Sequence, residues 1–132
     1  MASDWAPMCF ELTPWRETGT HLLKGAGMEE VQMMLDDHLV KTQAMQMTPA
    51  GLVFEKDLVA WLTLLTEVAS VVDHWLRVQG RWLYLEPIFG SADIMHQMPR
   101  EGAVFKEVDT SFRAIMKRTL KHPEVNSSDA VF

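Results

Sequence analysis

The sequence predicts a mainly α-helical fold, an elongated helical bundle around one long central helix, with a small N-terminal β-hairpin. Three observations support this prediction. In the long stretch 52–89, apolar residues recur every three or four positions. A similar but shorter pattern occurs in 28–47 and in 99–121. In 9–24, two short runs typical of strands flank a group of turn formers.

Composition limits the class of protein. The chain has 132 residues, which is room for one domain, and its single cysteine fits a reducing compartment, so we expect a cytoplasmic protein. The formal net charge of −6 argues against broad electrostatic binding of nucleic acid. No run of 18 apolar residues is present, and we expect neither a nucleic-acid nor a membrane partner. The 5 tryptophans are large anchors that need burial or a partner.

The hairpin is expected over 9–24, with Pro14, Thr18 and Gly19 as turn formers between its two strands. A hairpin of two strands is only marginally stable alone in water, so it must pack against another element. The glycines of the stretch 25–27 then break the pattern before a helix begins.

The first helix is expected over 28–47. The run TPAG at 48–51 ends it, because proline and glycine so close together are a strong stop. The residues of its apolar stripe recur at helical spacing, and they are Met28, Val31, Leu35, His38, Leu39, Thr42 and Met45.

The long helix is expected over 52–89. Its stripe alternates steps of four and three residues, which predicts a helix packed along its length against others. Two polar residues, Gln79 and Glu86, fall on this stripe. They lie at its edge, bond internal backbone groups, or face a partner surface, and the sequence leaves all three open. The residues that we expect in the structural core are Trp61, Leu65, Trp75 and Trp82, with Phe105 from the last helix.

Proline and glycine lie at the end of the long helix, at Pro87 and Gly90. Pro87 falls in its last turn, so we expect a kink or a local break there. Glu86 and Asp93 are the candidates for polar contacts that fix this break. A final helix is expected over 99–121, followed by a frayed tail over 122–132.

The sequence predicts no catalytic, cofactor-binding or metal site. It contains no Gly-Lys-Ser/Thr phosphate loop and no paired ligand spacing such as His-x3-His or Cys-x2-Cys. The consecutive residues Asp36, Asp37 and His38 fan around a helix rather than converge. Cys9 lies in an expected strand, where a small buried residue is the usual case. We therefore expect that the chain is not an enzyme and needs no cofactor.

The last helix carries basic residues beside its apolar stripe, namely Arg113, Lys117, Arg118 and Lys121. Calmodulin binds basic amphipathic helices, but cations near a helix C-terminus also stabilise the helix dipole. The alternative function is therefore a free-standing helical adaptor that binds calmodulin or another acidic partner through this helix.

A family resemblance is carried by the run WLRVQGRWLYLEPIF at 75–89, which closely resembles the central signature of the dynein heavy-chain linker region, N-terminal region 2. The run LDDHLVKTQAM at 35–45 is similar to the preceding linker helix and leans toward axonemal inner-arm chains. The resemblance covers about 5–121, which would be a segment of the linker domain, and it is lost after Val125.

The resemblance implies a force-transmitting linker segment of an ATP-driven, minus-end-directed microtubule motor. In that family the linker is a helical rod across a hexameric AAA+ ring, and the ATP sites lie elsewhere in the heavy chain. The implied partners are the remainder of the heavy chain, with its AAA+ ring, and the dynein intermediate and light chains. The implied location is the cytoskeleton, in the axoneme of a cilium or flagellum.

A linker must bend, and two loops are the candidate places, because their backbones lack a continuous helical ladder. These are the loops 48–51 and 89–93. The candidate hinge residues within them are Pro49, Gly51 and Gly90.

Overall fold

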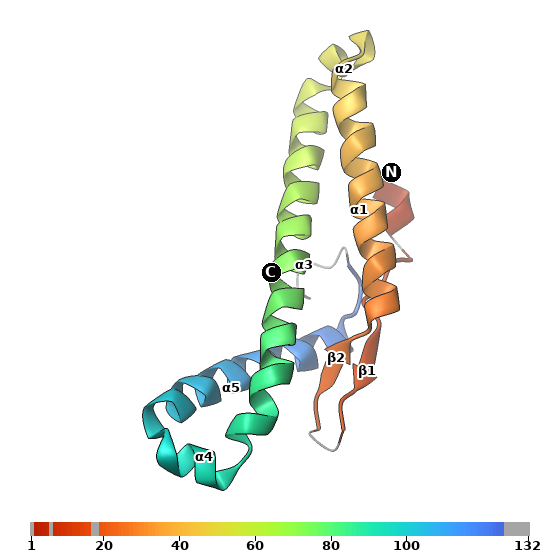
Figure 1. The fold of residues 1–132 in the computed structure, drawn as a ribbon. Helices are drawn as coiled ribbons and strands as arrows, with labels where there is room; N and C mark the ends of the chain where they lie inside the picture. Colours follow the sequence, from red (N-terminus) through yellow and green to blue (C-terminus); the bar gives the residue numbers. More distant parts are fainter. Residues whose placement is uncertain (1, 6, 17–18, 126–132) are drawn as a thin grey trace.

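The structure, a computed structural model, describes residues 2–5, 7–16 and 19–125. It confirms a mainly helical fold with a long helix and a small antiparallel hairpin near the N-terminus (Figure 1). In chain order the elements are a 3-10 helix η1 (Ala2–Trp5), β1 (Leu12–Pro14), β2 (His21–Leu23), α1 (Gly25–Gln46), α2 (Pro49–Val53), α3 (Glu55–Phe89), α4 (Ala92–Gln97) and α5 (Pro99–Lys121).

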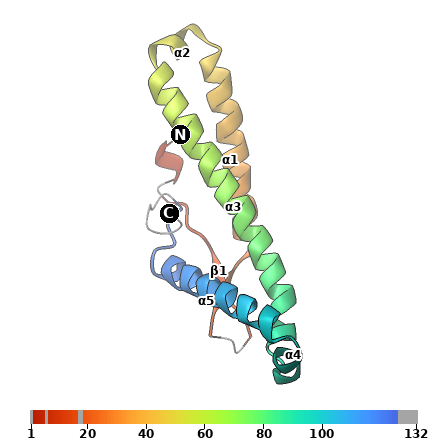
Figure 2. The same cartoon turned by 90° about the vertical axis from the view of Figure 1, so that its left-hand side faces the viewer.

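The helices form an elongated arrangement rather than a ball. α1 and α3 run side by side, and the short α2 closes the turn between them at one end (Figure 1). Figure 2 shows that α3 continues well beyond the start of α1, and that α4 reverses the chain so that α5 runs back across α3. The hairpin lies beyond the first turn of α1, where β2 contacts both α3 and α5.

The hairpin leads into α1 without an intervening loop. Leu12 of β1 pairs with Leu23 of β2, and α1 begins at Gly25, three residues earlier than expected. Gly27, in the first turn of α1, is buried. A Cβ atom there would lie only 2.9 Å from the side chain of Glu11. This glycine therefore serves close packing of α1 on the hairpin and does not break the helix.

The two ends of the described chain lie together. Backbone hydrogen bonds of 2.6 and 3.0 Å join residues 8–10 to 123–125, and Val125 is buried. The expected frayed tail is therefore wrong for 122–125, because this part of the chain has backbone partners and an apolar anchor. Cys9, expected to be buried, is exposed. The remainder of the expected tail lies outside the described residues, as does Thr18 of the expected hairpin turn.

The turn after α1 is a capped helix rather than an open loop. The Thr48 hydroxyl accepts a hydrogen bond from the Gly51 amide (3.2 Å) and donates one to the Met45 carbonyl (2.7 Å). Pro49 occupies the first turn of α2. An N–H at this position would have no partner within the helix, so proline loses no hydrogen bond here. The single helix expected over 52–89 is interrupted at Phe54, and α3 starts after it.

α3 shows no break at Pro87 and continues to Phe89. The expected local break is wrong, because helical geometry continues through Pro87 to Phe89 although proline cannot donate the hydrogen bond to the Leu83 carbonyl. The helix ends at Gly90, whose amide donates to the Glu86 carbonyl at 2.8 Å.

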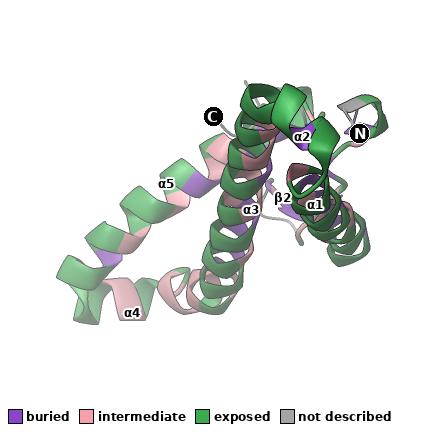
Figure 3. Ribbon diagram, turned by 90° about the horizontal axis from the view of Figure 1, so that it is seen from above, coloured by how far each residue is buried: buried purple, intermediate pink, exposed green. Residues whose placement is uncertain are grey.

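The core lies where the hairpin, α1, α3 and α5 face one another, whereas α2 at the far end is mostly exposed (Figure 3). The polar residues His38, Thr42 and Gln79 are buried with the apolar ones. The buried apolar residues are Trp5, Phe10, Leu22, Leu23, Met28, Val31, Leu35, Leu65, Val72, Trp75, Trp82, Phe112, Met116 and Val125.

Candidate functional site

The structure brings β2, α3 and α5 together at one place, which we call the central junction. It consists of Leu23 from β2, Gln79 and Trp82 from α3, and Asp109, Phe112 and Arg113 from α5. Of these, only Trp82 was expected in the structural core, and Gln79 was singled out as a polar residue on an apolar stripe.

Gln79 binds the free edge of the hairpin. Its Oε1 accepts a hydrogen bond from the Leu23 amide (2.8 Å), and its Nε2 donates to the Leu23 carbonyl (3.2 Å). The Lys24 amide donates to the carbonyl of Glu11, the residue before β1, so the backbone groups of the neighbouring Leu23 point away from β1. Of the three possibilities left open for Gln79, the structure shows bonding to internal backbone groups.

Trp82 joins α3 to α5 through a carboxylate. Its Nε1 donates to Asp109 Oδ1 at 2.8 Å, and the Arg113 Nε donates to the same carboxylate at 3.0 and 3.1 Å. The indole is 1% exposed and stacks on Phe112, with ring centroids 4.8 Å apart. Hydrogen bonds to an ionised acceptor are stronger than neutral ones, so this cluster fixes the position of α5 on α3.

The other expected core residues are buried to different extents. Leu65 and Trp75 are buried, and the Trp75 ring meets Phe10 edge-on at 5.1 Å. Trp61 and Phe105 are only partly buried at the margin of the core. The indole Nε1 atoms of Trp61 and Trp75 are enclosed without a hydrogen-bond partner among the described residues.

An aromatic contact joins the end of α3 to α5. Phe89 stacks on Phe105 of α5, with centroids 5.2 Å apart and planes 17° from parallel. Asp93 is exposed in the first turn of α4, and Glu86 is partly buried beside Phe89. Within the part of the chain that the structure describes, neither carboxylate has a side-chain hydrogen bond or ion pair, so the structure shows no polar contact by which Glu86 or Asp93 fixes the end of α3.

Sequence reasoning missed a second polar cluster between η1 and α1. The Trp5 indole donates to His38 Nδ1 at 3.0 Å, and His38 Nε2 lies 3.5 Å from the Asp4 carboxylate. Nδ1 accepts a hydrogen bond here, so the ring proton lies on Nε2. The sequence indicated only that a tryptophan such as Trp5 needs burial or a partner. It did not indicate that this partner is His38.

An exposed ion pair lies one turn further along α1. Lys41 Nζ is 2.7 Å from the Asp37 carboxylate. The hydrogen bond and the charge of Asp37 raise the pKa of Lys41 above its ordinary value, and the charge of Asp4 adds to this. The pair is solvated, so it contributes little to stability.

The candidate hinge residues lie in different surroundings. Pro49 and Gly51 belong to α2, and a Cβ atom at Gly51 would collide with the Met45 carbonyl oxygen. Gly90 lies between α3 and α4, with a Cβ position 3.1 Å from the Glu86 carbonyl oxygen. The turn at Gly51 is therefore tightly packed.

The largest apolar side chains near the basic residues of α5 are buried and not available, although Leu120 is exposed among them. Phe112 and Met116, the largest buried side chains of α5, are 2% and 1% exposed. Arg113 binds Asp109 within the central junction. Lys117, Arg118 and Lys121 are exposed on the other sides of the helix.

These features define a helical structural segment in which polar and aromatic contacts fix the helices to one another. Across residues 2–5, 7–16 and 19–125, no group of three or more His, Cys, Asp or Glu residues could hold a metal ion. No helix in that same part of the chain is long and apolar enough to cross a membrane.

The family is shown by comparison with known proteins. The family model described as dynein heavy chain, N-terminal region 2, matches residues 1–131, so this chain belongs to the dynein heavy chain family. This confirms the resemblance seen in the sequence, and the match continues past Val125, where that resemblance was lost.

Several relatives are similar over nearly the whole chain. The chain is 42% identical over 125 residues to dynein axonemal heavy chain 12 of Rattus norvegicus, and the aligned region covers 95% of this chain and 4% of that protein. The human protein of the same name is 43% identical with the same coverage. Dynein axonemal heavy chain 3 of Mus musculus is 41% identical over 129 residues, or 95% of this chain and 3% of that protein. The chain thus spans a small fraction of the length of these relatives.

Proposed function

We propose that this chain is a force-transmitting segment of the linker of an axonemal dynein heavy chain, an ATP-driven, minus-end-directed microtubule motor. The family match and the axonemal names of its relatives support this proposal. The cytoskeleton of a cilium or flagellum is the corresponding location. The observation that carries the mechanical role is the 35-residue helix α3, which is braced by two other elements at the central junction.

The bracing explains how α3 could carry load. A helix of this length spans about 52 Å at ~1.5 Å per residue, and long unsupported helices curve. Gln79 and Trp82 are one turn apart on α3, and they bind the hairpin and α5 respectively. Bending α3 at this point would therefore require breaking side-chain contacts to two elements as well as deforming the helix.

We assign no catalytic step to this chain. ATP hydrolysis in the proposed motor belongs to other parts of the heavy chain, which are also the main proposed partner of this segment. Dynein intermediate and light chains are further proposed partners of the assembled complex.

Bending is better supported at Gly90 than at Pro49 or Gly51. The contacts around Gly90 are a backbone hydrogen bond and stacking of Phe89 on Phe105, and both can be re-formed after a small rotation. At Gly51 the close approach to the Met45 carbonyl leaves no such freedom. The adaptor alternative has less support, because calmodulin would need the apolar face of α5 that carries the buried Phe112 and Met116.

The test is an Asp109→Ala substitution in the full heavy chain that contains these residues. Removing the carboxylate leaves the Trp82 and Arg113 donors without their shared acceptor and loosens α5 on α3. We expect slower microtubule gliding while ATP hydrolysis continues, which is a loss of coupling. The matched control is Glu107→Ala, which removes an exposed carboxylate two residues away. Equal gliding velocities for the two variants would contradict the proposal.

A further inference from the structure

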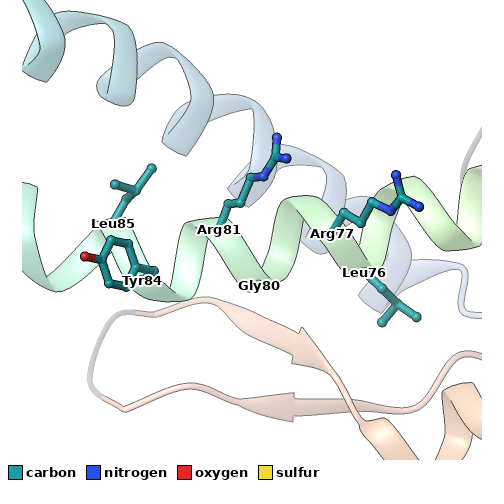
Figure 4. Close-up of a pocket in the computed structure, with 6 residues that line it drawn as sticks. All are labelled: Leu76, Arg77, Gly80, Arg81, Tyr84 and Leu85. Carbon is teal, nitrogen blue, oxygen red and sulfur yellow. The ribbon is translucent and has the colours of Figure 1, made fainter.

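The outer face of α3 carries a shallow groove that the proposed mechanical role does not use (Figure 4). All six of its lining residues belong to α3, in three adjacent pairs spaced four apart, namely Leu76, Arg77, Gly80, Arg81, Tyr84 and Leu85. At 3.6 residues per turn, these positions share one face of the helix, opposite to the face of Gln79 and Trp82. The groove therefore faces away from Gln79 and Trp82, and only Leu76 at its edge also packs against the core.

Gly80 has no packing contact among the described residues that explains it. Apart from the adjacent backbone of α3, no heavy atom of these residues lies within 4 Å of the position that a Cβ atom would occupy there, whereas Gly27, Gly51 and Gly102 each meet a neighbouring group. Gly19 and Gly25 are equally open, but Gly19 has a positive φ and Gly25 is the first residue of α1, whereas Gly80 lies inside a helix. A glycine inside a helix is destabilising relative to alanine, because its backbone loses more conformational freedom on folding. A bare backbone at such a point allows the backbone of another element to approach closely. The open position over Gly80 thus indicates a neighbour from outside these residues.

The groove has an apolar part that suits a protein partner. Tyr84 is 72% exposed, and Leu76 and Leu85 are partly exposed beside it. Tyrosine and arginine are enriched in protein interfaces, where an aromatic ring buries a large area at a small entropy cost. Docking an apolar surface here would cover Tyr84 and the two leucines.

The rim of the groove is positively charged. Figure 4 shows Arg77 and Arg81 projecting to the same side of α3, with Gly80 between them. Arg77 is 3.1 Å from Asp73, while Arg81 has no ion pair within the described ranges of the chain. The charge complement is a carboxylate. A second copy docked by the same face would place arginine against arginine, which disfavours a symmetric dimer.

We propose that this groove docks an amphipathic helix that carries carboxylates, supplied by a part of the heavy chain outside these residues. The bare backbone at Gly80 admits the helix closely, Arg81 binds its carboxylate, and Tyr84 packs on its apolar side. The relatives are more than twenty times longer than this chain, so a partner on the same polypeptide is available at high effective concentration. This inference rests on the proposed function, because it assumes the heavy chain.

The test uses the full heavy chain with a photo-crosslinking phenylalanine derivative at position 84. We expect a crosslink to a helical segment of the same polypeptide that has aspartate or glutamate near the linked residue. Arg81→Glu should reduce the crosslink several-fold by charge repulsion, and Gly80→Leu should do so by filling the groove. The control Arg100→Glu reverses an exposed charge on α5 and should leave the yield unchanged. A second crosslinker at Met33, 71% exposed on α1, should not label the same segment.

The outcomes separate the groove from the mechanical role. A crosslink to another polypeptide, to a segment without carboxylates, or one insensitive to Arg81→Glu would overturn the docking proposal. If gliding still depends on Asp109 in that case, the mechanical role stands and only the groove is wrong. A crosslink as expected, with gliding unaffected by Asp109→Ala, would instead contradict the mechanical role alone.

Discussion

The carboxamide of Gln79 makes two hydrogen bonds to the backbone of Leu23, a residue 56 positions away in the chain. The side chain thereby takes the place that a third strand would have beside β2. A hairpin of two three-residue strands is held on a 35-residue helix by this pair, by the contacts of β2 with α5, and by the packing of Leu22 and Leu23 in the core.

Replacing Gln79 by leucine should destabilise the chain by about 1–3 kcal/mol, because two buried backbone groups of Leu23 lose their partners. Urea unfolding measures the loss, and amide hydrogen exchange at Leu23 should accelerate at the same time. Gln43→Leu, at an exposed position of α1, is the control and should change stability by less than about 0.5 kcal/mol. If the Leu23 amide stayed as protected as before, the pairing would not exist in solution.

Trp75→Ala should cost about 3–5 kcal/mol in unfolding free energy, since it removes a buried indole and its contact with Phe10. Tyr84→Ala is the matched control on the exposed side of the same helix and should have little effect. Chemical denaturation of both variants gives the comparison. Similar losses in the two variants would show that Trp75 is not a core residue.

Two glycines of the chain should respond to alanine in opposite directions. Gly80→Ala should stabilise the isolated chain by about 0.5–1 kcal/mol, because alanine is the better helix former and meets no neighbour. Gly51→Ala should destabilise it, because the added methyl group collides with the Met45 carbonyl. Thermal unfolding measures both, and a stabilising Gly51→Ala would refute the packing described for α2.

Asp109 and Arg113 should show coupled effects on stability through Trp82. Removing Asp109 leaves the Trp82 indole N–H without its acceptor, so Asp109→Ala should cost about 1–3 kcal/mol. Asp109→Asn keeps an acceptor and should cost less. A double-mutant cycle with Arg113→Ala measures the coupling, and strictly additive effects would argue against the shared carboxylate.

His38 should exist as the Nε2–H tautomer. The Trp5 indole donates to Nδ1, so the proton must lie on the nitrogen that faces Asp4. Nitrogen-15 NMR distinguishes the two ring nitrogens, and Nδ1 of His38 should resonate as the unprotonated one. The exposed His96 provides the comparison, with averaged signals. A protonated Nδ1 in neutral His38 would rule out the Trp5 hydrogen bond.

Local periodicity predicted most of the helices, because the apolar stripes report directly on which faces are buried. The stripe of α1 is an example, since Met28, Val31, Leu35, His38 and Thr42 are all buried. Glycine and proline were less informative. Gly27 is a close-packing residue. α1 ends just before the run 48–51, as expected, but Pro49 also begins the short helix α2, which was not expected. Glycine occurs both at helix breaks and at close-packed positions, and proline occurs both after the end of a helix and in the first turn of one. The sequence alone therefore could not distinguish these roles.

Contacts between distant segments could not be predicted from local patterns. The stripe placed Gln79 on a buried face but did not identify Leu23 as its partner. The pairing of residues 8–10 with 123–125 joins the start of a strand-like run to a segment that has no periodic pattern. Nothing in the local sequence marks Asp109 as a contact residue, and only the crossing of α5 over α3 places it beside Trp82.

The edge of β2 has a consequence for how the protein behaves at high concentration. An open strand edge presents unpaired N–H and C=O groups, onto which another chain can add a strand. At Leu23 the edge is already occupied by a side chain of the same molecule. A glutamine from a helix therefore protects the hairpin from strand addition and aggregation, and the molecule needs no charged or bulged edge at that position.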